Sequence, residues 1–206
     1  MTVGDDVRVA LDHWSAREWT ESVARACDAV AGTAIKRYPD LGKAARFTRT
    51  VRSGVDIFGA MAAADIDFAR SRLPVPVDSR LPGGKPDIAD VLYAVHRYLD
   101  GEHSAIPGGC VVTAPVETVP MFHIHRGHLR MRASAALGLL AVAVLAPENK
   151  GESIGGSYTL GWRQHVFHII GWWGWQDHFR EILTTNEVEP QELDFGPEWA
   201  HWESVR

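Results

Sequence analysis

Three of the ten histidines of this chain fall within six positions, at His123, His125 and His128. Imidazole rings bind transition metals and transfer protons near neutral pH. On a strand, His123 and His125 would face the same side, as a metal site requires. No cysteine or carboxylate stands at ligand spacing beside them, so we expect no structural metal here and no cofactor. A histidine-metal-dependent hydrolase is nevertheless kept as a second alternative function.

Basic side chains form the second group that could bind a ligand. Six of them stand between positions 36 and 52, against the single acid Asp40. A local basic surface can contact phosphates although the net charge of the chain is −5. A solvated helix face is the alternative interpretation. The expected RNA-binding residues are Lys36, Arg37, Lys43, Arg46, Arg49 and Arg52.

The C-terminal part has the opposite charge. Residues 181–203 contain seven acids and no Lys or Arg. Such an acidic tail favours the function of a non-catalytic interaction partner. The acids are Glu181, Glu187, Glu189, Glu192, Asp194, Glu198 and Glu203.

Two helices are expected to position the basic residues. Ser15 and Glu18 have the spacing of a capping box, which predicts a helix that begins there and ends near Arg37. Asp40 can cap a second helix, in which apolar residues recur every three or four positions. Together they predict a long helical hairpin over residues 15–70. Its buried face is expected to include Trp19, Val23, Phe47, Val51, Phe58 and Ile66.

The remaining elements are shorter. A loop rich in Pro and Gly over residues 73–86 precedes a third helix, expected from Asp87 to about Gly101. The second half is expected to hold extended pieces over 108–119, a helix over 129–145, a strand over 158–170 and a helix over 177–183.

These elements predict one mainly α domain over residues 1–206. It is a helical bundle with a long N-terminal helical hairpin and a small β element in the C-terminal half. The length and the 46% of hydrophobic residues suffice for one core, and they exclude a disordered chain.

The third helix and the residues after it read Asp90-Val-Leu-Tyr-Ala-Val-His-Arg97-Tyr-Leu-Asp-Gly-Glu-His103. This segment resembles the part of HEPN domains that carries their Arg-x(4–6)-His motif. The first two helices, joined by Tyr38-Pro-Asp-Leu-Gly42, are similar to the helical hairpin of that family. The resemblance covers about residues 14–103, and an α+β part over about residues 108–206 follows it.

The resemblance implies a metal-independent endoribonuclease of a toxin–antitoxin or antiviral defence system, active as a homodimer. Arg97 and His103 are its implied catalytic residues. A histidine can take the proton of a ribose 2′-hydroxyl, and an arginine can stabilise the charge that develops on the phosphate. Tyr98 stands where active members usually carry Asn, Asp or His. The alternative function is therefore a non-catalytic helical interaction, neutralising or assembly protein.

The sequence also indicates a compartment. The first ten residues include Asp5 and Asp6 and lack the basic and apolar regions of a secretory signal. Cys27 and Cys110 are too few for a disulfide framework, so we expect two buried thiols. The most apolar run, residues 133–146, is too short to span a bilayer. We expect a cytoplasmic protein without a membrane partner.

Overall fold

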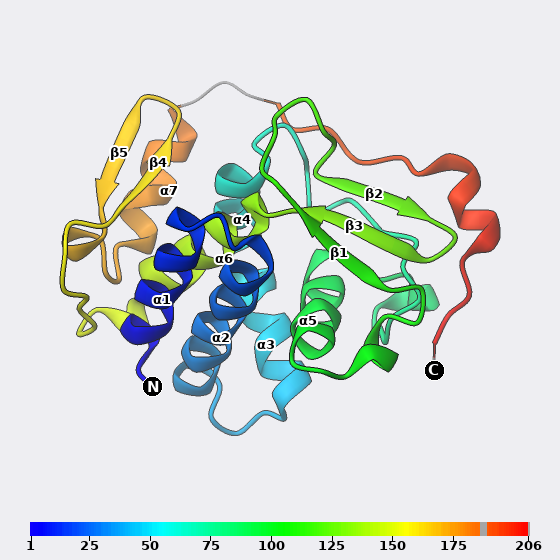
Figure 1. Cartoon of the computed structure of the whole chain (residues 1–206), viewed down its shortest axis with the longest axis horizontal. Coiled ribbons are helices and arrows are strands. Elements are labelled where there is room, and N and C mark those ends of the chain that lie inside the picture. Colours follow the sequence, from blue (N-terminus) through cyan, green and yellow to red (C-terminus); the bar gives the residue numbers. More distant parts are fainter. Residues whose placement is uncertain (186–188, 206) are drawn as a thin grey trace.

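The computed structural model describes residues 1–185 and 189–205, and it is mainly α-helical with two small β-sheets (Figure 1). The central helices lie between the three-stranded sheet on one side and a β-hairpin with the last helix on the other. The helices are α1 (Val3–Ser15), α2 (Trp19–Arg37), α3 (Lys43–Ser53), α4 (Val55–Ala62), α5 (Ile88–Leu99), α6 (Ser134–Leu145) and α7 (Gln176–Thr184). The strands are β1 (Cys110–Thr113), β2 (Phe122–His125), β3 (His128–Arg132), β4 (Thr159–Trp162) and β5 (His165–His168).

The first helix, α1, is an element that the sequence analysis did not predict. Its capping box is formed by Thr2 and Asp5, whose side chains each accept the backbone N–H of the other residue. The capping box expected at Ser15 and Glu18 is wrong. Ser15 is the last residue of α1, and Glu18 precedes α2 without a side-chain cap.

The expected second helix of the hairpin is divided into α3 and α4. Gly54 separates them with φ −123° and ψ 24°, and α4 ends at Ala62. A Cβ at Gly54 would lie 3.2 Å from a methyl group of Val142, so the glycine lets the bend approach α6 closely. The residue before α3 is Gly42, and the cap expected from Asp40 is wrong.

The expected buried face of the hairpin is largely confirmed. Val23, Phe47, Val51 and Phe58 are buried, because each faces the core from its helix. Trp19 and Ile66 are only partly buried. Trp19 is the first residue of α2, and Ile66 lies beyond the end of α4. At these ends the rest of the protein covers the two side chains only in part.

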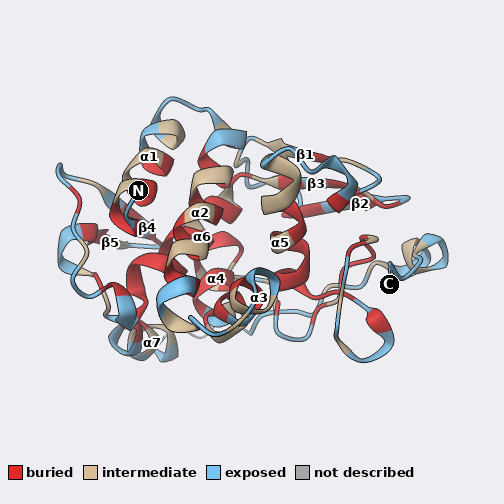
Figure 2. Ribbon diagram, turned by 90° about the horizontal axis from the view of Figure 1, so that it is seen from below, coloured by how far each residue is buried: buried red, intermediate tan, exposed pale blue. Residues whose placement is uncertain are grey.

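Helix α6 is the centre of the fold and is buried on nearly all sides (Figure 2). It packs against α4, α2 and α1. The helix expected over residues 129–145 is wrong in its first part, because β3 precedes a helix that begins at Ser134. In β3, buried Leu129 and Met131 alternate with exposed Arg130, which is the two-residue period of a strand.

Strand β3 is the middle strand of the three-stranded sheet. It pairs in parallel with β1 and antiparallel with β2. Arg126 and Gly127 form the turn between β2 and β3, both at positive φ. His123 and His125 share the exposed face of β2, as expected for this spacing on a strand.

Several shorter elements agree with the sequence analysis. Helices α5 and α7 match the helices expected over residues 87–101 and 177–183. The strand expected over residues 158–170 is a hairpin of β4 and β5 that turns at Arg163 and Gln164.

Cys27 and Cys110 are free, buried thiols. None of the helices that the structure describes is both long and apolar enough for a membrane crossing.

The C-terminal segment, residues 189–205, returns along the loop that precedes α5 (Figure 1). Gln191 forms a β-bridge with Ile66, and Val205 forms another with Asp78. The end of the acidic segment is thereby fixed beside the loop. Glu187, which belongs to the same acidic segment, lies outside the described residues.

Candidate functional site

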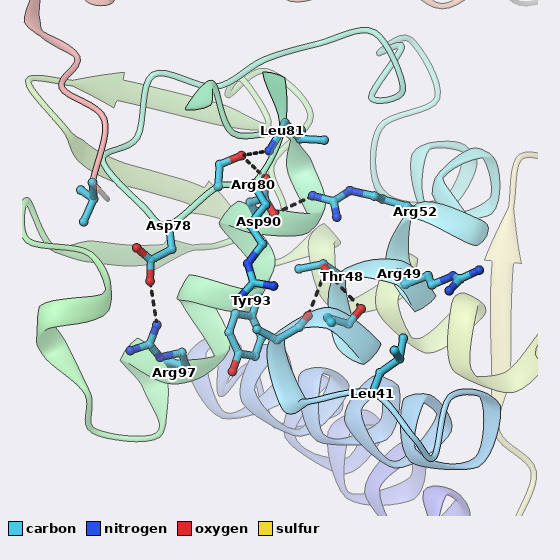
Figure 3. A pocket seen from close by; sticks show the side chains of 14 residues that line it. Leu41, Thr48, Arg49, Arg52, Asp78, Arg80, Leu81, Asp90, Tyr93 and Arg97 are labelled. Carbon is cyan, nitrogen blue, oxygen red and sulfur yellow. Dashed lines mark hydrogen bonds and ion pairs between the residues drawn. The ribbon is translucent and has the colours of Figure 1, made fainter. Parts of the chain in front are cut away.

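A cavity of about 930 Å³ lies between α3, α5 and the loop before α5 (Figure 3). Val205, from the C-terminal segment, also lines it. Two arginines reach it from α3, one from the loop and one from α5. They are Arg49, Arg52, Arg80 and Arg97.

Arg52 is the arginine held most firmly in this cavity. Its Nε lies 2.7 Å from Asp87 Oδ2, and its Nη2 lies 2.6 Å from Asp90 Oδ1. Partial burial lowers the pKa of Arg52, but the hydrogen bond and charge of Asp87 and the charge of Asp90 outweigh it and raise that pKa. Asp87 also caps α5 through the N–H of Asp90. Arg52 therefore joins α3 to the start of α5.

Arg97 sits near the other end of α5 and pairs with two carboxylates. Its guanidinium donates two hydrogen bonds to Glu102 and lies 3.9 Å from Asp78. The hydrogen bond to Glu102 raises the pKa of Arg97 and lowers the pKa of Glu102. The guanidinium also lies over the ring of Tyr93, 5.8 Å from its centroid. Arg97 is exposed enough for a ligand to reach it, with 31% of its side chain accessible.

Arg49 and Arg80 are exposed, and neither forms an ion pair with another described residue. The guanidinium of Arg49 lies over the ring of Tyr38, 4.8 Å from its centroid. These two cations are thus open to an anionic ligand without breaking an internal salt bridge.

A second cavity, of about 390 Å³, adjoins the first because Tyr93 and Arg97 line both. It lies between α2, α3 and α5. Lys43 and Arg46 line it from α3. His96 lines it from α5 and lies 3.1 Å from Asp28 on α2. We call the two cavities together the arginine groove.

Two of the expected RNA-binding residues lie elsewhere. Lys36 bonds Asn149 and Glu152, and Arg37 bonds Glu148 and Ser53. Neither residue lines the arginine groove. The structure uses them to join the end of α2 to the segment after α6, whereas it brings Lys43, Arg46, Arg49 and Arg52 together with Arg97.

His103 lies just beyond the groove, in the 3-10 turn His103–Ala105. Its ring packs edge-on against Tyr98, with 4.8 Å between the centroids. The turn itself follows Gly101, whose φ of 98° reverses the chain at the end of α5. Glu102, between Gly101 and His103, bonds Arg97, and no contact joins Arg97 to His103 among the described interactions.

The three clustered histidines are on the β2–β3 hairpin, away from the groove. His125 lies 3.3 Å from Glu198, and His128 Nδ1 lies 2.7 Å from the carbonyl of Gly108. Across residues 1–185 and 189–205, no group of three or more His, Cys, Asp or Glu side chains has an arrangement that could hold a metal ion.

Three residues of the groove were missed by the sequence analysis. Arg80 is an isolated basic residue in a loop, and Tyr93 has the spacing of a core position. His96 precedes Arg97 in the segment that resembles HEPN domains, but no role was assigned to it. A step of about one turn along α5, from Tyr93 to Arg97, was the available signal, since residues four apart share a helix face.

Comparisons with known proteins give one consistent match. The model of a family described as Rv1289 matches residues 2–199. Three relatives, described as uncharacterized proteins, are each 44% identical over 207 residues and cover 100% of this chain and 99% of their own length. They are Mb1320 of Mycobacterium bovis and MT1327 and Rv1289 of two strains of Mycobacterium tuberculosis. No solved structure matches the chain.

Proposed function

This chain belongs to the Rv1289 family, and we propose that it binds RNA in the arginine groove and cleaves it without a metal ion. The observation that carries the proposal is the convergence of six cations on two adjoining cavities. They are Lys43, Arg46, Arg49, Arg52, Arg80 and Arg97.

The arrangement of these cations suits a chain of phosphates better than one small anion. They come from α3, α5 and the loop, and they are divided between two cavities that meet at Tyr93 and Arg97. Arginine binds phosphate oxygens through two parallel N–H donors. Successive phosphates can therefore contact different arginines along the groove.

Aromatic rings at the same place favour a single strand over a duplex. Tyr93 lies at the junction, and Tyr38 lies beneath Arg49. Unstacked bases pack on tyrosine rings and guanidinium planes, and the ribose 2′-hydroxyl is the group that distinguishes RNA from DNA.

Arg97 is the residue best placed to act on the reacting phosphate, because among the arginines that the structure describes it alone lines both cavities. Its present partners, Glu102 and Asp78, are exposed carboxylates, and exposed ion pairs contribute little to stability. A phosphate can displace them. The guanidinium would then stabilise the negative charge that develops on the phosphorus.

The test is to incubate the purified protein with total RNA, with and without EDTA, beside the variants Arg97→Ala and Arg8→Ala. Arg8 is a matched control because it is a partly exposed arginine paired with a carboxylate, Asp12, on α1. We expect cleavage that resists EDTA, persists in Arg8→Ala and is lost in Arg97→Ala. Cleavage that requires a metal, or that survives Arg97→Ala, would contradict the proposal.

A non-catalytic interaction protein is the second proposal, and an exposed apolar surface favours it. Val166, Ile170 and Trp175 are 63%, 68% and 52% exposed around β5 and the start of α7. Exposed apolar groups of this kind are common where another protein binds. A protein that cleaves no RNA but forms a stable complex with a cellular protein, lost on Trp175→Ser, would favour this function.

The homodimer implied by the HEPN resemblance is part of the first proposal. Light scattering on the purified protein measures its mass directly. A mass of twice 22.7 kDa is the expected result.

A further inference from the structure

We infer that His96, held by Asp28, is the general base of the proposed cleavage, so the second cavity of the arginine groove is where the ribose of the cleaved nucleotide binds. This inference rests on the proposed function and adds a residue and a position to it.

Contacts on two sides fix the imidazole of His96. Its Nε2 lies 3.1 Å from Asp28 Oδ1, and its ring stacks on Phe47 with 5.5 Å between centroids and 22° between planes. Asp28 is itself fixed, because Arg25 donates a hydrogen bond to its other oxygen at 3.0 Å. A carboxylate beside one ring nitrogen keeps the proton there and leaves the lone pair on the other nitrogen. In His96 the nitrogen left to accept a proton is Nδ1.

The charges around His96 suit work on a phosphodiester. Lys43 and Arg46 face the cavity from α3, and neither is ion-paired to another described residue. Arg97 faces it from the next position on α5. The remaining charged groups are carboxylates: Asp28 from α2, Asp100 from the end of α5, and Glu102 beyond it. The volume of about 390 Å³ is within the range of small-ligand sites.

His96 and His103 differ in their surroundings. His96 is the one histidine among the described residues that line the groove, and 20% of its side chain is accessible. His103 lines neither cavity, and its contact is an aromatic one with Tyr98. A general base needs a fixed orientation and access to the substrate, and His96 has both.

The inferred step is an internal transfer of the phosphate. His96 Nδ1 takes the proton of the ribose 2′-hydroxyl, and the 2′-oxygen forms a bond to phosphorus. The bond from phosphorus to the 5′-oxygen breaks, and that oxygen takes a proton from water. The resulting hydroxide takes the proton from His96, which restores the base. The products are a 2′,3′-cyclic phosphate and a free 5′-hydroxyl, with no oxidant or reductant consumed.

The experiment uses the full chain and two fluorescent oligonucleotides, one of DNA with a single ribose and one entirely of DNA. Cleavage is measured on the first, and affinity is measured on the second, which cannot react. The variants are His96→Ala, His96→Asn, Asp28→Asn and His103→Ala. Thermal unfolding identifies any variant that fails to fold, and His96→Asn keeps a polar group if His96→Ala does not fold.

We expect His96→Ala and His96→Asn to cleave about 100-fold or more slowly than the wild type, with affinities for the DNA probe within about threefold. Imidazole added to His96→Ala should restore part of the rate, which a purely structural role would not do. Asp28→Asn should slow cleavage about tenfold or more, because the wrong tautomer is favoured. This inference gives His96 the role that the HEPN resemblance implies for His103, so His103→Ala should keep most of the wild-type rate. The products of the wild type should end in a 2′,3′-cyclic phosphate.

The outcomes separate the two proposals. If the wild type cleaves while His96→Ala and His96→Asn keep their rates, or while His103→Ala loses its rate, the assignment of His96 is wrong and RNA cleavage itself stands. If the wild type binds the probe but never cleaves at the ribose, both the cleavage and the assignment are wrong. If imidazole gives no rescue of a folded, inactive His96→Ala, the role of His96 is structural and the inference is overturned.

Discussion

Arg97 lies over the ring of Tyr93, one helical turn earlier on α5, and both side chains line both cavities of the arginine groove. The pair therefore stands where the two cavities adjoin. Glu102 and Asp78 are paired with the same guanidinium. Binding of a phosphate at Arg97 is thus a competition between the ligand and two carboxylates of the chain.

This competition predicts that Glu102→Gln binds RNA more tightly than the wild type. The substitution removes the charge that occupies Arg97 and leaves the guanidinium in place. We expect an increase in affinity of about two- to fivefold, measured by fluorescence anisotropy with a single-stranded RNA at low salt. Asp65→Asn makes the same change of charge at an exposed position outside the groove. An equal gain in Asp65→Asn would show that only the net charge matters.

Asp6 predicts a change of stability with pH. It is buried in α1, and one of its oxygens has no hydrogen-bond partner among the described residues. Burial, and then the charge of Asp28, raise the pKa of Asp6 to about 6 in the folded protein, above the ordinary value of 3.8 for an aspartate. The folded state therefore holds this proton more tightly than the unfolded state. The protonated Asp6 contributes most to the free energy of unfolding below about pH 4, and this contribution is lost as the pH rises through about 6.

Asp6→Asn should therefore be more stable than the wild type at pH 7, by roughly 1–2 kcal/mol, and about equal at pH 4. Urea unfolding at the two pH values measures this difference. Asp5→Asn is the matched control on the same helical turn. The hydrogen bonds from Thr2 lower the pKa of Asp5, so its substitution should destabilise the protein at pH 7. If the free energy of unfolding of Asp6→Asn does not exceed that of the wild type by more at pH 7 than at pH 4, the prediction is contradicted.

Gly138 predicts a packing defect at the centre of the fold. A Cβ at this position of α6 would lie 2.6 Å from Phe58 Cδ2 and 2.8 Å from the Phe58 carbonyl. Gly138→Ala should therefore cost about 1–3 kcal/mol of unfolding free energy, despite the higher helix propensity of alanine. Gly155→Ala, where a Cβ meets no atom within 4 Å, should be close to neutral. Equal unfolding midpoints for the two variants would show that α4 and α6 are not this closely packed.

The elements that sequence reasoning found are those with strong periodicity. Helix α5 has its apolar residues at steps of three and four, with Asp87 as a cap whose side chain accepts the N–H of Asp90. Helix α1 has no such clear separation of apolar and polar positions, because Gly4 and Asp6 are buried among its apolar residues. The break at Gly54 depends on contact with α6, which is distant in the sequence. No local pattern could show it.

The site was predicted in part for the same reason. Arg46, Arg49 and Arg52 were visible as a basic cluster on one helix. The meeting of that helix with Arg97 depends on the ion pairs of Arg52 with Asp87 and Asp90, which join residues far apart in the chain. Lys36 and Arg37 belong to the same cluster in the sequence, but the fold turns them toward Glu152 and Glu148. Charge alone does not distinguish a ligand site from an internal salt bridge.

The salt dependence of RNA binding tests most directly whether the arginine groove holds a chain of phosphates. The measurement compares the wild type with the triple variant Arg46→Ala/Arg49→Ala/Arg80→Ala, which removes three cations that have no ion pair with a described residue. A second triple variant, Arg8→Ala/Arg130→Ala/Lys150→Ala, loses the same charge outside the groove.

We predict that the groove variant binds single-stranded RNA at least about tenfold more weakly, and that its slope of log affinity against log salt is smaller by about two. The second variant should keep a slope close to that of the wild type. Equal slopes and affinities for the wild type and the groove variant, or an equal loss in both variants, would contradict RNA binding in the arginine groove.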